Sequence, residues 1–199
     1  MMYLLPSGSD NVKNMQKDRF GIIRTPASKN AYGIQNGFLW AADIGMNGGC
    51  IDKYISWLDN LLPYQKTCLF VVVPDVLCNP IATQSNYRNI AWMLKEKGWP
   101  IAFVAQDGQE NLPMPEFDYL FIGGSTEWKL GASALACIRY AKSIGKPVHI
   151  GRVNTLKRIK HFMLADADSV DGTGWCYAPK TYERDLKRWM NYIPLNINN

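Results

Sequence analysis

The chain has 199 residues, of which 47% are hydrophobic and 20% are charged. This length suits one domain with its own core, and the composition is that of an ordinary folded protein. No apolar run approaches the length that spans a bilayer. The N-terminal stretch MMYLLPSGSD lacks the basic segment and the long apolar segment of a secretion signal. We therefore expect a single domain over residues 1–199, in the cytoplasm and not in a membrane.

The net charge of +5 and the pI of about 8.9 are a mild basic excess, which is compatible with a polyanionic partner. The basic residues gather in two expected helices near the C-terminus. One holds Lys157, Arg158 and Lys160, and the other holds Lys180, Arg184, Lys187 and Arg188. Such runs are usually solvated helix faces, so they permit nucleic-acid binding without establishing it.

The chain has five cysteines, at positions 50, 68, 78, 137 and 176, and two histidines. No pair of cysteines has C-x-x-C spacing, so we expect buried thiols in a reducing compartment and no metal site. A phosphate loop of the G-x-G-x-x-G type is also missing, because the segment from Gly45 to Gly49 has the wrong spacing. We therefore expect no cofactor.

Taken in chain order, short apolar stretches alternate with stretches of helical periodicity. We expect strands at Tyr3–Pro6, Phe20–Ile23, Phe38–Ala42, Cys68–Val73, Ile101–Ala105, Phe117–Ile122, Pro147–Gly151 and Ala165–Val170. We expect helices at Asn11–Arg19, Ile51–Leu62, Ala82–Lys97, Ala132–Ile144 and Tyr182–Tyr192, and one that Asn154 or Thr155 caps and that continues through Leu164. Residues 25–37 are expected to be a loop and residues 196–199 a loose tail.

This alternation requires a parallel sheet, either an open doubly wound one or a closed barrel. Polar or glycine residues follow nearly every strand, namely Asp43, Asp75, Gln106, Gly123, Arg152 and Asp171. Convergence of so many strand ends on one rim favours a compact TIM-type (β/α)8 barrel of roughly seven or eight strands. Asp171 with Gly172 is also a common turn pair, so Asp171 alone does not indicate catalysis.

The strand-end motifs occur in an order that resembles one known family. The motifs are WAADIGMNGG with Asp43, VVVPD with Asp75, FVAQDG with Gln106 and Gly108, LFIGG with Gly123 and Gly124, VHIGRVN, and ADADSVDGT with Asp168 and Asp171. The order resembles the tRNA-guanine transglycosylase superfamily, especially its small DNA-acting branch that handles 7-deazaguanine bases. The resemblance covers roughly Trp40 to Thr173 and implies that Asp171 is the nucleophile.

The chain departs from this family in two places. The tRNA-acting members carry a cysteine-rich zinc site after the barrel, which this sequence lacks, and the residues after Asp43 are Ile44-Gly45-Met46 in place of small residues. Both departures argue against tRNA and favour a different nucleic acid or a different base. The expected partners are DNA and a free modified purine base.

Cleavage of an N-glycosidic bond passes through an oxocarbenium-like sugar, for which two carboxylates are suited. We assign the attack on C1′ to Asp171 and the proton transfer to Asp43, whose alternative role is a helix cap. Asp75 and Gln106 are expected to read the edge of the base. Backbone at Gly123 and Gly124 would approach the flat base, unless the pair only forms a tight turn.

The remaining expected contacts concern the rest of the substrate. We expect Lys129, Arg152, Asn154 and Lys157 to bind the substrate, with the basic side chains on phosphates, and Trp40 or Trp128 to stack on the base. A base inside a duplex is out of reach, so such an enzyme must flip it or use a single strand. The expected function is base exchange in DNA. Hydrolytic excision of a modified base by a DNA glycosylase and a non-catalytic nucleotide-binding barrel stay open as alternatives.

Overall fold

The computed structural model describes residues 1–6, 10–45, 50–174 and 178–191. Three subjects of the sequence analysis lie outside the described residues: positions 46–49 of the glycine-rich loop, Cys176, and the tail from residue 192.

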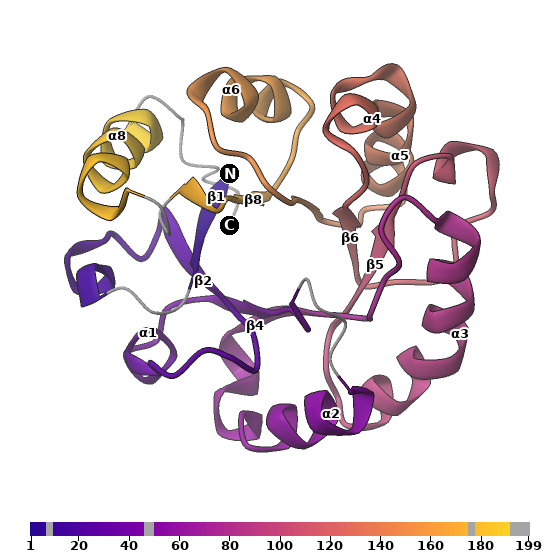
Figure 1. Cartoon of the computed structure of the whole chain (residues 1–199), viewed down its shortest axis with the longest axis horizontal. Coiled ribbons are helices and arrows are strands. Elements are labelled where there is room, and N and C mark those ends of the chain that lie inside the picture. The colour runs from indigo at the N-terminus through magenta and orange to yellow at the C-terminus, as the bar shows by residue number, and fades with distance from the viewer. Residues whose placement is uncertain (7–9, 46–49, 175–177, 192–199) are drawn as a thin grey trace.

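Eight described strands form a closed barrel in which each strand pairs in parallel with the next one along the chain and the last pairs with the first (Figure 1). The strands are β1 (Met2–Pro6), β2 (Phe20–Arg24), β3 (Trp40–Ala42), β4 (Cys68–Val72), β5 (Ile101–Ala105), β6 (Tyr119–Ile122), β7 (Val148–Ile150) and β8 (Ser169–Asp171). The predicted (β/α)8 barrel is therefore confirmed. The carboxyl ends of the strands meet at one rim, called the mouth below. The amino ends meet at the other, called the bottom rim.

Helices surround the barrel, as Figure 1 shows for α1, α2, α3, α5, α6 and α8. The α-helices are α1 (Tyr32–Gln35), α2 (Ile51–Asp59), α3 (Pro80–Glu96), α4 (Thr126–Leu130), α5 (Ala132–Ser143), α6 (Leu156–Leu164) and α8 (Pro179–Asn191). Short 3-10 helices lie at Asp10–Asn14, Leu62–Thr67 and Gln109–Asn111. Each helix that follows a strand starts near the mouth, because the preceding strand ends there.

Two local expectations are wrong, and one short helix was not predicted. The expected helix at Asn11–Arg19 is only the 3-10 turn Asp10–Asn14, and the expected loop at residues 25–37 contains the single turn α1. Helix α4 went unpredicted because it is short; it starts after Ser125, whose hydroxyl accepts a hydrogen bond from the Trp128 backbone N–H at 3.2 Å. These are elements whose few residues give no readable periodicity.

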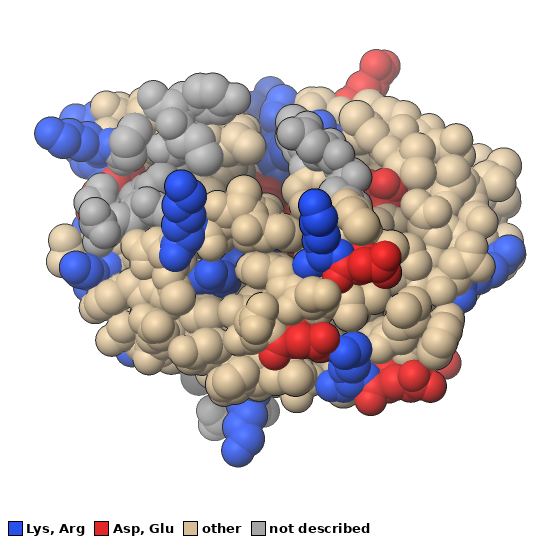
Figure 2. Space-filling model, turned by 60° about the horizontal axis from the view of Figure 1, so that its bottom comes forward, with Lys and Arg blue, Asp and Glu red and all other residues tan. Residues whose placement is uncertain are grey.

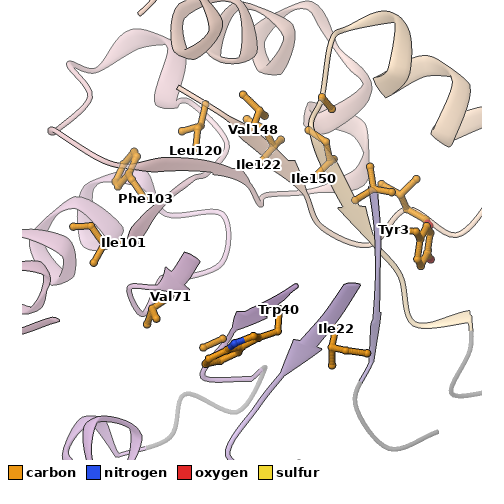
Figure 3. Close-up of a cluster of buried hydrophobic side chains, with 14 of the residues drawn as sticks. Tyr3, Ile22, Trp40, Val71, Ile101, Phe103, Leu120, Ile122, Val148 and Ile150 are labelled. Carbon is orange, nitrogen blue, oxygen red and sulfur yellow. The ribbon is translucent and has the colours of Figure 1, made fainter. Parts of the chain in front are cut away.

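Side chains alternate along each strand between the helices and the barrel interior. Those facing the helices form the larger core, part of which Figure 3 shows. Trp40 belongs to it: the side chain is fully buried, its indole N–H donates to the Tyr64 carbonyl at 3.0 Å, and its ring packs edge-on against Trp99 at 5.9 Å. The expectation that Trp40 stacks on a base is therefore wrong.

The barrel interior has a separate apolar core. Its members are Leu4, Ile23, Ala41, Phe70, Val72, Ala102, Val104, Tyr119 and Phe121. These side chains fill the lower barrel, as in other barrels of this size, so that chemistry is confined to the mouth.

The cysteines differ from the expectation of buried thiols. Cys50 and Cys78 are exposed and Cys68 is partly exposed, whereas Cys137 is buried; all four are free thiols. The reason is location, since Cys50 directly precedes α2 and Cys78 lies in the loop after β4. Within the described ranges, no helix combines the length and the apolar character that crossing a membrane requires.

Candidate active site

Three carboxylates from strands far apart in the chain meet at the mouth. Asp43 directly follows β3, Asp75 lies three residues beyond β4, and Asp171 is the last residue of β8. The negative charges of Asp171 and Asp75 both act on Asp43 and raise its pKa. The structure therefore brings together the acids that the sequence analysis selected.

Asp43 continues the alternation of β3, in which Ala41 faces the barrel interior, so its carboxyl group faces the mouth. Burial is the largest cause that raises its pKa to about 6; the charges of Asp171 and Asp75 add to it, and the hydrogen bond from the Gly45 backbone N–H opposes it. That bond is 3.0 Å long. Cys50, not Asp43, precedes the first turn of α2, so the alternative role as a helix cap is excluded.

Asp171 is held by the turn that follows β7. Its Oδ1 accepts a hydrogen bond from the Arg152 backbone N–H at 2.5 Å, and its side chain is 17% exposed. Arg152 has a left-handed backbone (φ 61°), a strained conformation for a residue other than glycine. Its guanidinium donates to the Gly124 carbonyl and lies close enough to Asp75 to oppose the rise in the pKa of that carboxyl, which burial causes.

Gln106 is fully buried, and the protein itself satisfies its amide. The Oε1 atom accepts from the backbone N–H groups of Cys78 and Gly124, each at 2.9 Å, and Nε2 donates to Asp75 Oδ2 at 2.5 Å. The structure thus gives Gln106 a different position from the expected one at the base edge: it fixes the Asp75 carboxylate and ties the β4 loop to the β6 loop. Asp75, which is partly exposed, is the group of this pair that faces solvent.

Gly123 and Gly124 form a tight turn after β6. A Cβ on Gly123 would lie 2.7 Å from Val104 Cγ1, and one on Gly124 would lie 2.8 Å from a ring carbon of Trp128. Gly124 also has a positive φ of 67°. Both glycines are buried among side chains of the protein, which favours the tight-turn alternative over a flat platform for a base.

Asp107 holds this turn, and the sequence analysis did not select it. Its carboxylate accepts from the Ser125 backbone N–H at 2.7 Å and from the Ser125 hydroxyl at 2.5 Å. Trp128 lies beside the same turn and donates its indole N–H to Glu110 at 3.0 Å. Trp40 and Trp128 were both expected to stack on a base. Of these two, Trp128 is the one that lies near the mouth, and its ring is partly exposed.

Lys129 is almost completely buried, and its ammonium donates to the Gly151 carbonyl at 2.6 Å. Burial and the charge of Arg152 lower its pKa to about 8, against the opposing charge of Asp171. This position connects α4 to the end of β7 and places a positive charge close enough to act on Asp171. It does not favour the expected direct contact with a phosphate.

Asn154 joins the loops after β7 and β8. Its side-chain oxygen accepts from the Gly174 backbone N–H at 3.0 Å, and its amide donates to the Thr173 hydroxyl at 3.3 Å. A Cβ on Gly172 would overlap Tyr3 and Asn154, and would lie 2.7 Å from the Val153 carbonyl, so the chain after Asp171 requires glycine. The expected substrate contact of Asn154 is thus replaced by a contact that shapes the loop after β8.

Lys157 is exposed in the first turn of α6, near the mouth, and its position is compatible with the expected phosphate contact. The basic run of α8 is partly neutralised, since Lys187 pairs with Glu183 at 2.8 Å and Asp185 lies 3.6 Å from Arg188. Figure 2 shows Lys and Arg side chains spread over one face, some of them beside acidic ones.

Asp168, which the resemblance placed just before the nucleophile, lies at the bottom rim of the barrel. Its carboxylate accepts from the Val148 backbone N–H at 2.7 Å and pairs with Lys142 at 3.0 Å. It precedes β8, whereas Asp171 ends β8, so the strand separates the two acids. Asp168 therefore stabilises the fold and takes no part in the site.

His149 and Ser169 lie inside the barrel directly below Asp171, and the sequence analysis did not select them. They pair across β7 and β8. The period-two alternation contained a signal, because His149 and Gly151, like Ser169 and Asp171, fall on the same face of their strands.

Among the described residues, no three His, Cys, Asp or Glu side chains converge closely enough to hold a metal ion. No family model matches the chain, and a search of curated proteins gives no match. The resemblance to base transglycosylases therefore rests on the strand-end motifs, and the class of protein that the fold defines is a (β/α)8 barrel with an acidic mouth.

Proposed function

We propose that the protein is a nucleic-acid base transglycosylase, in which Asp171 is the nucleophile and Asp43 transfers the proton. The single observation that supports this most strongly is the pair of carboxyl groups from β3 and β8 at one mouth, one of which has its pKa raised to about 6. A carboxyl group that exchanges its proton near neutral pH, beside a second carboxylate, suits the cleavage of an N-glycosidic bond.

The reaction takes two steps. Asp171 forms a bond to C1′ of the sugar while the bond from C1′ to the base nitrogen breaks; the base leaves with the electron pair and takes a proton from Asp43. In the second step the incoming base gives its N–H proton to Asp43, attacks C1′ and releases Asp171. A covalent intermediate of this kind divides one difficult displacement into two easier ones.

Asp75 and Trp128 are the proposed contacts with the base. The Asp75 carboxylate, oriented by Gln106, accepts N–H groups from the edge of the base, and the partly exposed Trp128 ring offers a surface for stacking. Lys157 binds a phosphate outside the mouth. The choice of DNA over tRNA, and of a 7-deazaguanine-type incoming base, follows the resemblance.

The test is product analysis after incubating the protein with DNA and an isotope-labelled 7-deazaguanine base. We expect the label to enter DNA and an unlabelled base to be released, on single-stranded DNA before duplex DNA because extruding a base costs a few kcal/mol. Nucleosides and free bases are measured by mass spectrometry. We expect Asp171→Asn to be the inactive variant. Asp18→Asn, which changes an exposed acid ahead of β2 at the bottom rim, is its matched control.

Each outcome decides between the candidates. Abasic sites that form without incorporation of label would replace exchange by hydrolysis with the same two acids. Unchanged nucleosides and bases on every DNA and RNA offered would overturn the catalytic proposal and leave a non-catalytic binding barrel. Equal activity of the Asp171→Asn variant and the wild-type protein would remove Asp171 from the reaction.

A further inference from the structure

A buried histidine lies under the proposed nucleophile with one ring nitrogen unsatisfied. His149 has no exposed surface, and its Nε2 has no hydrogen-bond partner among the described residues. The nearest acidic atom is Asp171 Oδ2, at 3.9 Å from Nε2. A buried polar atom without a partner costs about 1–3 kcal/mol, so its presence in a core requires an explanation.

The other side of the ring is fixed. His149 Nδ1 lies 2.9 Å from the Ser169 hydroxyl, and that hydroxyl lies 3.3 Å from the Tyr119 hydroxyl. The rings of Phe70 and Phe121 pack against the imidazole with centroid separations of 5.1 and 4.7 Å. The imidazole is thus clamped, and only the direction toward Asp171 is left without a partner.

Either hydroxyl can donate in this chain of contacts, and the role of Nδ1 depends on the tautomer of the ring, so two proton arrangements fit the geometry. In one arrangement the Tyr119 phenol, whose pKa burial raises, donates to Ser169. Ser169 then donates to Nδ1, and the N–H group of the ring lies at Nε2, the atom that faces Asp171. This tautomer directs an N–H group at Oδ2 of a carboxylate that can only accept.

We propose that His149 is a positioning residue for Asp171, acting from inside the barrel through its Nε2–H group. The separation of 3.9 Å between Nε2 and Oδ2 is longer than a hydrogen bond. A small rotation of the carboxylate toward the ring closes the contact. The Arg152 backbone N–H holds Oδ1 and His149 holds Oδ2, so the plane of the carboxylate is fixed from two directions while its outer edge faces the substrate.

This inference rests on the proposed function for its catalytic meaning, but its structural core is tested without substrate. The chain has only two histidines, so protein labelled with ¹⁵N-histidine gives two sets of ring signals, and His161→Gln assigns them. We expect His149 to be the neutral Nε2–H tautomer. Its Nε2 signal should shift in Asp171→Asn and stay unchanged in the control Asp18→Asn.

The catalytic part is tested by single-turnover base release with two variants. His149→Phe keeps the aromatic volume between Phe70 and Phe121 but removes the donor, and we expect base release to slow by roughly ten- to a hundredfold with DNA affinity unchanged. His149→Gln keeps an N–H donor on a flexible chain and should recover part of the rate. Thermal unfolding of both variants shows whether the fold is intact.

The results separate the two proposals. An Nδ1–H tautomer, or an Nε2 signal that ignores Asp171→Asn, would overturn the positioning role whether or not the protein exchanges bases. A coupled Nε2 signal in a protein without exchange activity would keep the contact and reject the proposed function. If base release occurs and a folded His149→Phe matches the wild-type rate, the positioning role is rejected and the function stands.

Discussion

The two ends of the barrel hold their acids in different ways. At the bottom rim, Asp168 accepts a hydrogen bond from the Val148 backbone N–H and pairs with Lys142. Asp118 accepts a hydrogen bond from the Ile101 backbone N–H at 3.0 Å. Burial works against the charge of Lys142, but Asp168 and Asp166 raise its pKa above the ordinary value. These contacts stabilise the charged form of Lys142 and hold the ends of strands.

At the mouth, by contrast, acids are placed next to acids. Burial and the charges of Asp171 and Asp75 raise the pKa of Asp43, and burial raises that of Asp75 although Arg152 opposes the rise. Arg152 itself has a left-handed backbone, and Lys129 is buried with its pKa lowered to about 8. The polar contacts at the mouth therefore lower the stability of the fold, whereas those at the bottom rim raise it, as is typical of sites arranged for chemistry.

The largest expected effect contrasts Asp171 with Asp168, the two acids of β8 and the segment before it. Asp171→Asn should slow base exchange at least about a thousandfold, because the proposed nucleophile is lost, while the free energy of unfolding changes by less than about 1 kcal/mol. Single-turnover incorporation of labelled base and denaturant unfolding measure the two quantities. A folded, fully active Asp171→Asn variant would contradict the assignment of the mouth as the reactive end.

The second effect concerns the stability cost of Asp43. Its carboxyl group has a pKa of 3.8 when unperturbed and about 6 in the fold. Below the lower value both states hold the proton and nothing is lost; as the pH rises through this window, only the unfolded state releases it, and the fold becomes less stable. Asp43→Asn should therefore raise the free energy of unfolding above pH 6 by up to about 3 kcal/mol, at ~1.4 kcal/mol for each pKa unit.

Urea unfolding of the wild type and Asp43→Asn at several pH values measures this gain, with the exposed acid Asp52 as the control in Asp52→Asn. The gain should vanish near pH 4. A gain that does not depend on pH would mean that Asp43 is not the strained acid. The same titration should appear in base release, which we expect to slow as the pH rises through about 6, because Asp43 then no longer holds the proton that the leaving base takes.

The third effect concerns an acid at the bottom rim, whose removal should cost stability and leave base exchange unchanged. Asp168→Asn removes the ion pair with Lys142 and weakens the bond to the Val148 backbone N–H, so we expect a loss of about 1–2 kcal/mol in stability. Base exchange at a temperature where the variant is folded should match the wild-type rate. Glu116→Gln, which removes a partner of Lys95 from an exposed pair, should have almost no effect on stability. A specific loss of exchange in Asp168→Asn would return that residue to the site.

The smallest effect concerns the rim of the mouth. Lys157→Ala should weaken DNA binding by about three- to tenfold at low salt and lower the salt dependence by about one released counterion, with stability unchanged. Lys95→Ala, which changes the last turn of α3 at the bottom rim, should change neither DNA binding nor its salt dependence. Binding titrations at several salt concentrations measure both. Equal losses for the two lysines would mean that DNA does not approach the mouth.

The sequence by itself determined the barrel and the strand ends that carry the acids. Strand Ile101–Ala105 was predicted with its observed bounds, because a short apolar run between turn residues has one good interpretation. The positions of Asp43, Asp75 and Asp171 followed from the parallel alternation, since parallel strands all end at the same rim. Their chemistry was an inference from their order, and it stays a prediction.

Only the tertiary structure decided what each polar group contacts. Gln106 and Lys129 were expected to face a substrate but satisfy buried partners of the protein, and Trp40 packs outside the barrel rather than at its mouth. His149 was passed over because its partners Ser169 and Asp171 become neighbours only when β7 pairs with β8 and the barrel closes. Periodicity fixes which face of a strand a side chain occupies, but hydrogen bonds, burial and pKa depend on neighbours that the linear sequence does not name.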